Sequence, residues 1–113
     1  MSQKIRTVIF FKDYFESFFV EQNEKVQKKI IWTINLIEEI QNVPETYLKH
    51  IKGTDGLYEV RVQVGSNIFR IFCFFDQGQL VVLMNGFQKK TQKTPKTEIE
   101  KALKIKKEYE QQN

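Results

Sequence analysis

The stretch from residue 57 to residue 87 most constrains the fold, because it holds three β-strand patterns separated only by tight turns. Leu57–Val64 alternates between apolar and polar side chains, and residues 68–75 and 80–87 follow with mostly apolar ones. Gly65-Ser66-Asn67 and Asp76-Gln77-Gly78-Gln79 separate the three patterns, and both are rich in turn-forming residues. Connections this short force consecutive strands to pair antiparallel, so we expect a three-stranded meander.

The residues before this meander predict a strand and then a helical hairpin. Residues 4–11 alternate and then become apolar, which is typical of a strand. Asp13 is suited to cap a short helix, and Asn23 is suited to cap a longer one that ends before Pro44. The longer helix carries apolar side chains every three or four residues, at Val26, Ile30, Ile34 and Ile37. We expect that face to pack on the sheet.

A terminal helix is predicted after the last strand. Thr94-Pro95 is a typical helix start, because proline at the first helical position removes no hydrogen bond. A modest apolar stripe follows, formed by Ile99, Ala102, Leu103 and Tyr109. The predicted order is therefore β-α-α-β-β-β-α in a single domain, residues 1–113. This is an α+β fold with its helices packed on one side of a small antiparallel sheet.

Length and composition indicate one globular domain without a membrane segment. The 113 residues are 41% hydrophobic and 28% charged, and ten phenylalanines supply large side chains for a core. The single cysteine, Cys73, lies in an apolar run and is expected in the core, in a reducing compartment. The start of the chain is polar, unlike a signal peptide, and no apolar run approaches the roughly 20 residues that span a bilayer. We expect a cytoplasmic protein that contacts no membrane.

The positive charge is concentrated towards the C-terminal end. Residues 1–87 hold ten Lys and Arg against ten Asp and Glu, whereas residues 88–113 hold eight Lys against four Glu, which gives the net charge of +4. A basic element on a neutral body is typical of a surface that faces a polyanion. An ordinary solvated helix face explains these charges equally well, so charge alone leaves both interpretations open.

The sequence lacks the common motifs of metal and nucleophilic catalysis. It has one His and one Cys, too few for a usual zinc site, and no Gly-rich phosphate loop, nucleophile elbow or HExxH helix. We expect neither a metal nor another cofactor. Catalysis would have to use Lys, Arg, Glu, Tyr or the single histidine, His50. A lone histidine is more often a surface residue, although a usual pKa of about 6.5 suits acid–base chemistry.

Alternation within the meander places charged side chains on one face of the sheet. If the valines of residues 57–64 meet the helices, Glu59 and Arg61 point the other way, and Arg70 on the next strand can share their face. Two neighbouring guanidiniums repel each other unless an anion lies between them. Glu59 could be that anion, which would make the cluster structural. We favour a phosphate held by both arginines, because the Lys-rich residues 88–96 follow nearby.

The last strand is expected to extend this face. Asn85 and Phe87 fall on one side of it and lead to Lys89 and Lys90.

Three segments of the chain match a known pattern. They are Gly56–Val62 (GLYEVRV), Phe69–Phe72 (FRIF) and Gly86–Pro95 (GFQKKTQKTP). Together they resemble the HigB-like branch of the RelE/ParE toxin superfamily, also described as phage-derived toxin-like proteins. The resemblance covers essentially the whole chain and is strongest between residues 56 and 95.

The resemblance implies a RelE/ParE-like fold and the toxin of a type II toxin–antitoxin system. Such toxins are metal-independent endoribonucleases, or mRNA interferases, which cleave mRNA, commonly on the ribosome, and so inhibit translation. In their reaction a 2′-hydroxyl attacks the adjacent phosphate. The resemblance also implies a cognate antitoxin, often a HigA-like protein with a helix-turn-helix domain.

The resemblance assigns roles to particular residues. Arg61 and Arg70 match two strand arginines that would hold the scissile phosphate. Lys89 and Lys90 match a lysine pair that would protonate the leaving oxygen or clamp the phosphate. The general base stays open between Glu59, His50 and a lysine. The side chains expected to contact RNA around this centre are Lys52, Phe87, Lys93, Lys96 and His50.

Two other functions are compatible with the sequence. One is a ParE-like inhibitor of DNA gyrase, which cuts no RNA and would leave transcripts intact. The other is a phage-derived module that binds nucleic acid or protein without toxicity, and its over-expression would be harmless.

Overall fold

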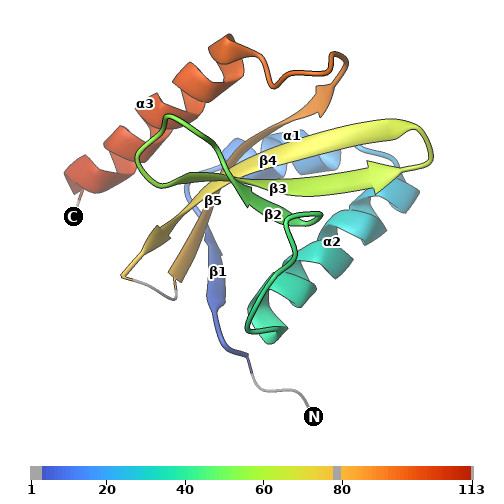
Figure 1. Ribbon diagram of the computed structural model, residues 1–113, viewed down its shortest axis with the longest axis horizontal. Helices are drawn as coiled ribbons and strands as arrows, with labels where there is room; N and C mark the ends of the chain where they lie inside the picture. The colour runs from blue at the N-terminus through green and yellow to red at the C-terminus, as the bar shows by residue number, and fades with distance from the viewer. Residues whose placement is uncertain (1–3, 78–79, 113) are drawn as a thin grey trace.

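The computed structural model describes residues 4–77 and 80–112, which form three helices and five strands (Figure 1). In chain order the elements are β1 (Thr7–Phe10), α1 (Tyr14–Val20), α2 (Glu24–Glu39), β2 (Leu48–His50), β3 (Leu57–Val64), β4 (Asn67–Asp76), β5 (Leu80–Lys89) and α3 (Lys96–Gln112). The α+β class is confirmed. The order contains one strand more than predicted, because the three-residue β2 is too short to show an alternating pattern.

All five strands belong to one sheet, in the order β1-β5-β4-β3-β2. The antiparallel meander of β3, β4 and β5 is confirmed, with Gly65 at a positive φ of 61° in the turn between β3 and β4. Gly78 and Gln79, predicted as part of the next turn, lie outside the described residues. The first strand pairs parallel with β5, so the sheet is mixed. Parallel pairing is possible there because the chain crosses over through α1 and α2 before it returns.

The helices cover both faces of the sheet (Figure 1). Phe18 of α1 and Ile30 of α2 pack with Val60 and Ile71 on one face, as predicted for the helical hairpin. Ala102 and Ile105 of α3 pack on the other face, so the expectation that all helices lie on one side is wrong for α3. The reason is that the sheet is apolar on both faces. The buried apolar side chains under α3 are those of Leu57, Phe72, Phe74, Val82 and Met84.

Local signals explain where the helices begin. The Asn23 side chain accepts a hydrogen bond of 2.9 Å from the backbone N–H of Val26, which confirms it as the cap of α2. Asp13 stands at the N-cap position of α1 but makes no side-chain capping bond. Pro95 immediately precedes α3, and its carbonyl accepts from the N–H groups of Glu98 and Ile99.

Cys73 is buried in the core as predicted, and burial raises the pKa of its thiol. In residues 4–77 and 80–112, no helix combines the length and the apolar character that crossing a membrane requires.

A β-bulge interrupts the pairing of β4 with β5. Ile71 pairs with Gly86 and Cys73 with Leu83, so two steps on β4 match three on β5. Beside the bulge, Gly86 lies under the ring of Phe18, and a Cβ at this glycine would come within 2.7 Å of that ring. The bulge and the glycine thus allow α1 to approach the sheet closely.

Candidate functional site

Register places the two strand arginines side by side. Arg61 of β3 pairs directly with Arg70 of β4, and Arg70 in turn pairs with Phe87 of β5. Directly opposed residues share a sheet face, as alternation predicted for Arg61 and Arg70. The prediction that this face carries no helix is wrong, because α3 packs on it and Arg70 is buried there. Glu59, two residues before Arg61, is on the same face.

The carboxylate of Glu59 lies between the two guanidiniums. Its Oε2 is 3.4 Å from Nε of Arg61 and 3.4 Å from Nε of Arg70. The Glu59 and Arg70 side chains are only 9% and 6% exposed, whereas that of Arg61 is 28% exposed. We call these three residues the arginine cluster. It contains two positive charges and one negative charge in a largely buried place.

The arginine cluster is only partly satisfied by hydrogen bonds. Arg70 donates from Nη1 to the carbonyl of Phe69 at 3.1 Å, and Arg61 donates from Nη1 to the carbonyl of Glu45 at 3.3 Å. The two Nε–H groups are in ion-pair range of Glu59 but lack hydrogen-bond geometry, and neither finds another acceptor among the described residues. Buried donors without a bond are costly. With two guanidiniums and one carboxylate, the cluster also keeps a net positive charge that an anion could neutralise.

Lys89 extends the positive field of the cluster. Burial lowers its pKa, and the nearby positive charges of Arg70, Arg61 and Lys49 lower it further, while Glu59 acts in the opposite direction. Burial also lowers the pKa of Arg70, helped by Arg61 and opposed by Glu59. The arginines stay charged at any physiological pH. Lys89 is therefore the cation at this site that gives up its proton more easily than an ordinary lysine.

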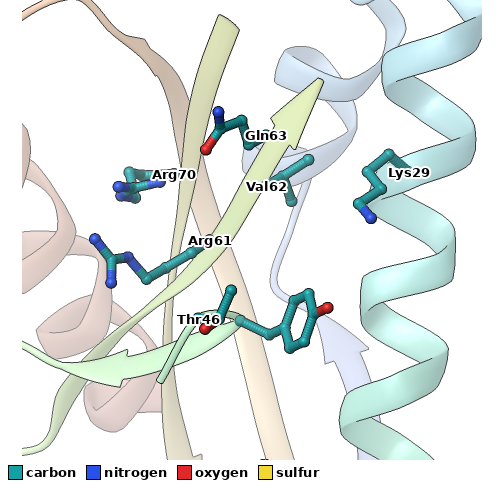
Figure 2. A pocket seen from close by; sticks show the side chains of 7 residues that line it. Lys29, Thr46, Arg61, Val62, Gln63 and Arg70 are labelled. Atoms are coloured by element: carbon teal, nitrogen blue, oxygen red, sulfur yellow. The ribbon is translucent and has the colours of Figure 1, made fainter. Parts of the chain in front are cut away.

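A hollow of about 350 Å³ opens beside the cluster at the edge of β3 (Figure 2). In Figure 2, Arg61 and Arg70 project from neighbouring strands, and Lys29 of α2 lies on the other side of β3. The hollow is lined by Lys29, Thr46, Tyr47, Arg61, Val62, Gln63 and Arg70. Three cationic side chains therefore line this hollow, with the two guanidiniums on one side of β3 and Lys29 on the other.

The segment after β5 is fastened next to the cluster. The Thr94 hydroxyl donates to Oε1 of Glu59 at 3.2 Å, which ties the start of α3 to the carboxylate between the arginines. Lys90, Lys93 and Lys96 are exposed along this segment. Phe87 is half-buried and stacks on Phe72 with a centroid distance of 5.6 Å. Phe87 therefore lies beside Arg70, and Thr94 fastens the segment that carries these three lysines to the cluster.

His50 and Lys52 are placed differently. His50 pairs with Tyr58 across β2 and β3 and meets its ring edge-on, at 5.2 Å between centroids. Tyr58 packs against the core beneath α1 and α2, so His50 lies on the sheet face opposite to the arginine cluster. Lys52 is exposed in the loop between β2 and β3. The structure thus does not bring His50 to the face that carries Arg61 and Arg70.

Sequence reasoning did not find all the residues near the cluster. Lys49 pairs with Glu59, which puts it on the arginine face, but β2 itself was not predicted. Lys29 and Tyr47 line the hollow from α2 and the following loop, which are distant in sequence from β3. In the sequence, a lysine on a predicted helix gives no signal that distinguishes a residue of a site from one on an ordinary solvated face. Among the described residues, His, Cys, Asp and Glu side chains do not gather in groups of three or more that could hold a metal ion.

The fold and the site define a class: a RelE-like α+β domain with a cationic cluster on its mixed sheet. Residues 17–107 match the model of a family described as phage-derived protein Gp49-like (DUF891), and the chain belongs to that family. This confirms the resemblance to phage-derived toxin-like proteins.

The chain is also similar to two curated proteins of Mycobacterium tuberculosis. Both are named probable endoribonuclease HigB1, one from strain CDC 1551 / Oshkosh and one from strain ATCC 25618 / H37Rv. Each is 45% identical over 56 residues, which is 50% of this chain and 42% of the relative. The match spans less than half the length of these relatives, and it indicates a distant homology.

Proposed function

We propose that the protein is an endoribonuclease toxin of a type II toxin–antitoxin system, which cleaves mRNA and thereby inhibits translation. The observation that carries this proposal is the arginine cluster, in which one carboxylate faces two guanidiniums beside an open cationic cavity. The similarity to proteins named probable endoribonuclease HigB1 supports the same chemistry.

In the proposed reaction, a phosphate of the RNA backbone enters the hollow and binds Arg61 and Arg70. The 2′-oxygen bonds to the adjacent phosphorus as the bond from phosphorus to the 5′-oxygen breaks, and the 2′-hydroxyl proton passes to solvent water, so the products are a 2′,3′-cyclic phosphate and a 5′-hydroxyl. The guanidiniums stabilise the negative charge that grows on the phosphate oxygens. Lys89 donates a proton to the leaving 5′-oxygen, which its lowered pKa favours. Glu59 acts as a positioning residue, because it holds both arginines and Thr94.

Growth and transcript integrity after induced expression test this proposal. We expect wild type to arrest growth and shorten transcripts, and Arg61→Ala and Lys89→Ala to abolish both effects. Lys107→Ala, an exposed change on α3, is the matched control and stays toxic. If all variants are equally toxic, the assigned site is wrong. Growth arrest with intact transcripts and altered DNA supercoiling would indicate a gyrase inhibitor instead of a nuclease. Harmless expression of folded protein would indicate a binding module.

We also propose that a cognate antitoxin, a HigA-like protein with a helix-turn-helix domain, silences the toxin. An acidic segment of the antitoxin would neutralise the surplus charge of the arginine cluster and Lys89. Co-expression should restore growth, and the complex should weaken at high salt. A complex whose affinity does not change with salt would contradict this mode of binding.

A further inference from the structure

The hollow at the arginine cluster continues along the edge of β3. A second hollow, of about 390 Å³, is lined by Lys25, Lys28, Lys29, Trp32, Gln63 and Val64. It shares Lys29 and Gln63 with the hollow that contains Arg61 and Arg70. The two hollows therefore adjoin each other, and we treat them as one groove that extends from the cluster to the outer surface of α2. We call it the β3-edge groove.

The groove exists because β3 is longer than its neighbour. Only Tyr58–Val60 of β3 pairs with β2, and the N–H of Arg61 bonds the carbonyl of Tyr47. Beyond Arg61, this side of β3 has no further strand partner among residues 4–77 and 80–112. The strand edge thus faces α2 across the groove instead of an adjacent strand.

An aromatic side chain lies at the far end of this groove. Trp32 of α2 is 47% exposed, although its indole is the largest apolar side chain in the protein. Tyr47 meets it edge-on with 5.5 Å between ring centroids, and Nζ of Lys29 lies 4.2 Å from the ring centroid. The ring is held from two sides while about half of its surface stays open to solvent. A held and exposed aromatic ring is suited to stacking with a flat ligand.

Cationic side chains border the same groove. Lys25 and Lys28 are exposed, and Lys29 is half-buried. The ion pair of Lys28 with Glu24 spans 3.1 Å, but both side chains are more than three-quarters exposed, at 77% and 81%. Such exposed pairs stabilise a protein little, so Lys28 can exchange this carboxylate for a phosphate.

We infer that the β3-edge groove binds single-stranded RNA that continues from the arginine cluster, with an unpaired base stacked on Trp32 and the backbone held by Lys28 and Lys29. This inference rests on the proposed function. Alternating cations and aromatic rings are the usual means of holding a single strand, because lysines follow the backbone and rings stack on bases. An acidic peptide would pair with the lysines, but its carboxylates would make no specific contact with the exposed indole.

Trp32 is the only tryptophan, so its fluorescence reports on this site directly. The probe is a short 2′-O-methyl oligouridine, which has no free 2′-hydroxyl and cannot be cleaved by the proposed reaction. We expect saturable quenching of Trp32 by this oligonucleotide in wild-type protein.

Anisotropy of the labelled oligonucleotide measures affinity in the variants. Trp32→Ala should weaken binding about 5- to 150-fold, the range measured for one base–aromatic stack. Lys28→Ala and Lys29→Ala should each reduce the slope of log affinity against log salt by about 0.7. Ile31→Ala is the matched control, because Ile31 is 43% exposed on the same helix and lines neither hollow of the groove.

The outcomes separate this inference from the proposed function. If the oligonucleotide binds in an Arg61-dependent manner without quenching Trp32, the inference that the β3-edge groove binds RNA is wrong, and the nuclease assignment stands. If wild-type protein neither binds the oligonucleotide nor cleaves RNA, both are overturned. If an acidic peptide quenches Trp32 and the oligonucleotide does not, the groove is a protein-binding surface and the inference is overturned.

Discussion

At the scale of single residues, Glu59 determines the electrostatics of the site. Its two oxygens contact three partners, namely Arg61, Arg70 and Thr94, and its side chain is almost fully buried. Since Arg70 is equally buried, the carboxylate is what makes a pair of adjacent guanidiniums tolerable in the folded protein.

Replacing this carboxylate by an amide of the same shape should destabilise the protein. In Glu59→Gln the Thr94 contact can persist, but two guanidiniums lose their counter-ion, and we expect the free energy of unfolding to fall by about 3–5 kcal/mol, the usual cost of removing one partner of a buried ion pair. Urea unfolding measures the change. Added phosphate should restore more stability to the variant than to wild type, because it replaces the missing charge. Equal stability and equal phosphate response in both proteins would contradict this account.

The lowered pKa of Lys89 predicts a pH dependence. If the Lys89 ammonium gives its proton to the leaving oxygen, cleavage slows as the pH rises through this pKa, and the alkaline limb lies below the ordinary value of 10.5. Lys89→Arg should move this limb upward, because a guanidinium keeps its proton. The rate of cleavage of a model RNA from neutral to alkaline pH measures it, and a limb at the same position in both proteins would exclude Lys89 as the acid.

The lowered pKa of Lys89 also determines how the stability of the fold changes with pH. A lysine whose folded-state pKa is lowered binds fewer protons in the folded than in the unfolded protein. Its charged form therefore weakens the fold below the lowered pKa, and that penalty is relieved as the pH rises towards 10.5.

The residues of the arginine cluster were predictable, whereas the opposite wall of its cavity was not. Arg61, Arg70 and Glu59 follow from strand alternation and the short turn between β3 and β4. Lys29 and Tyr47 reach the cavity only through the packing of α2 and the path of the next loop. No local pattern encodes those long-range contacts.

At the scale of elements, the approach of α1 to the sheet depends on the absence of a side chain at Gly86. A Cβ there would meet three atoms of the Phe18 ring between 2.7 and 2.9 Å. The bulge in β5 lies beside this contact.

Gly86→Ala should therefore destabilise the fold by about 1–3 kcal/mol, the usual cost of overpacking. Combining it with Phe18→Leu, which removes the ring, should reduce the penalty, so the two changes are not additive. Thermal unfolding of the two single variants and the double variant measures this coupling. Additive effects would show that the contact between Gly86 and Phe18 does not limit the packing.

The helices and strands differ in how well the sequence predicted them. The meander and α2 were predicted because turns and caps agree with apolar periodicity, as the Asn23 cap shows. The position of α3 was not, since a modest apolar stripe does not say which sheet face receives it. The continuous apolar run Ile71–Phe75 of β4, buried from Ile71 to Phe74, was the available signal that both faces are covered.

At the scale of the whole molecule, cationic groups from distant parts of the chain converge. The lysine-rich segment after β5 lies beside the arginine cluster through Thr94, and the lysines of α2 line the same groove from the other side of β3. The net charge of +4 thus understates the local positive field. Under the proposed function, this field would bind the phosphates of RNA.

The most direct test of the central claim is primer-extension mapping of transcript ends in cells after induction, with wild type and Arg61→Ala compared. Arg61 is the more exposed of the two arginines, so its removal should leave the fold intact, which circular dichroism of the purified variant can verify. We predict new 5′ ends within translated reading frames for wild type and none for Arg61→Ala. Arrested growth without new ends in wild type would contradict the assignment of this protein as an endoribonuclease.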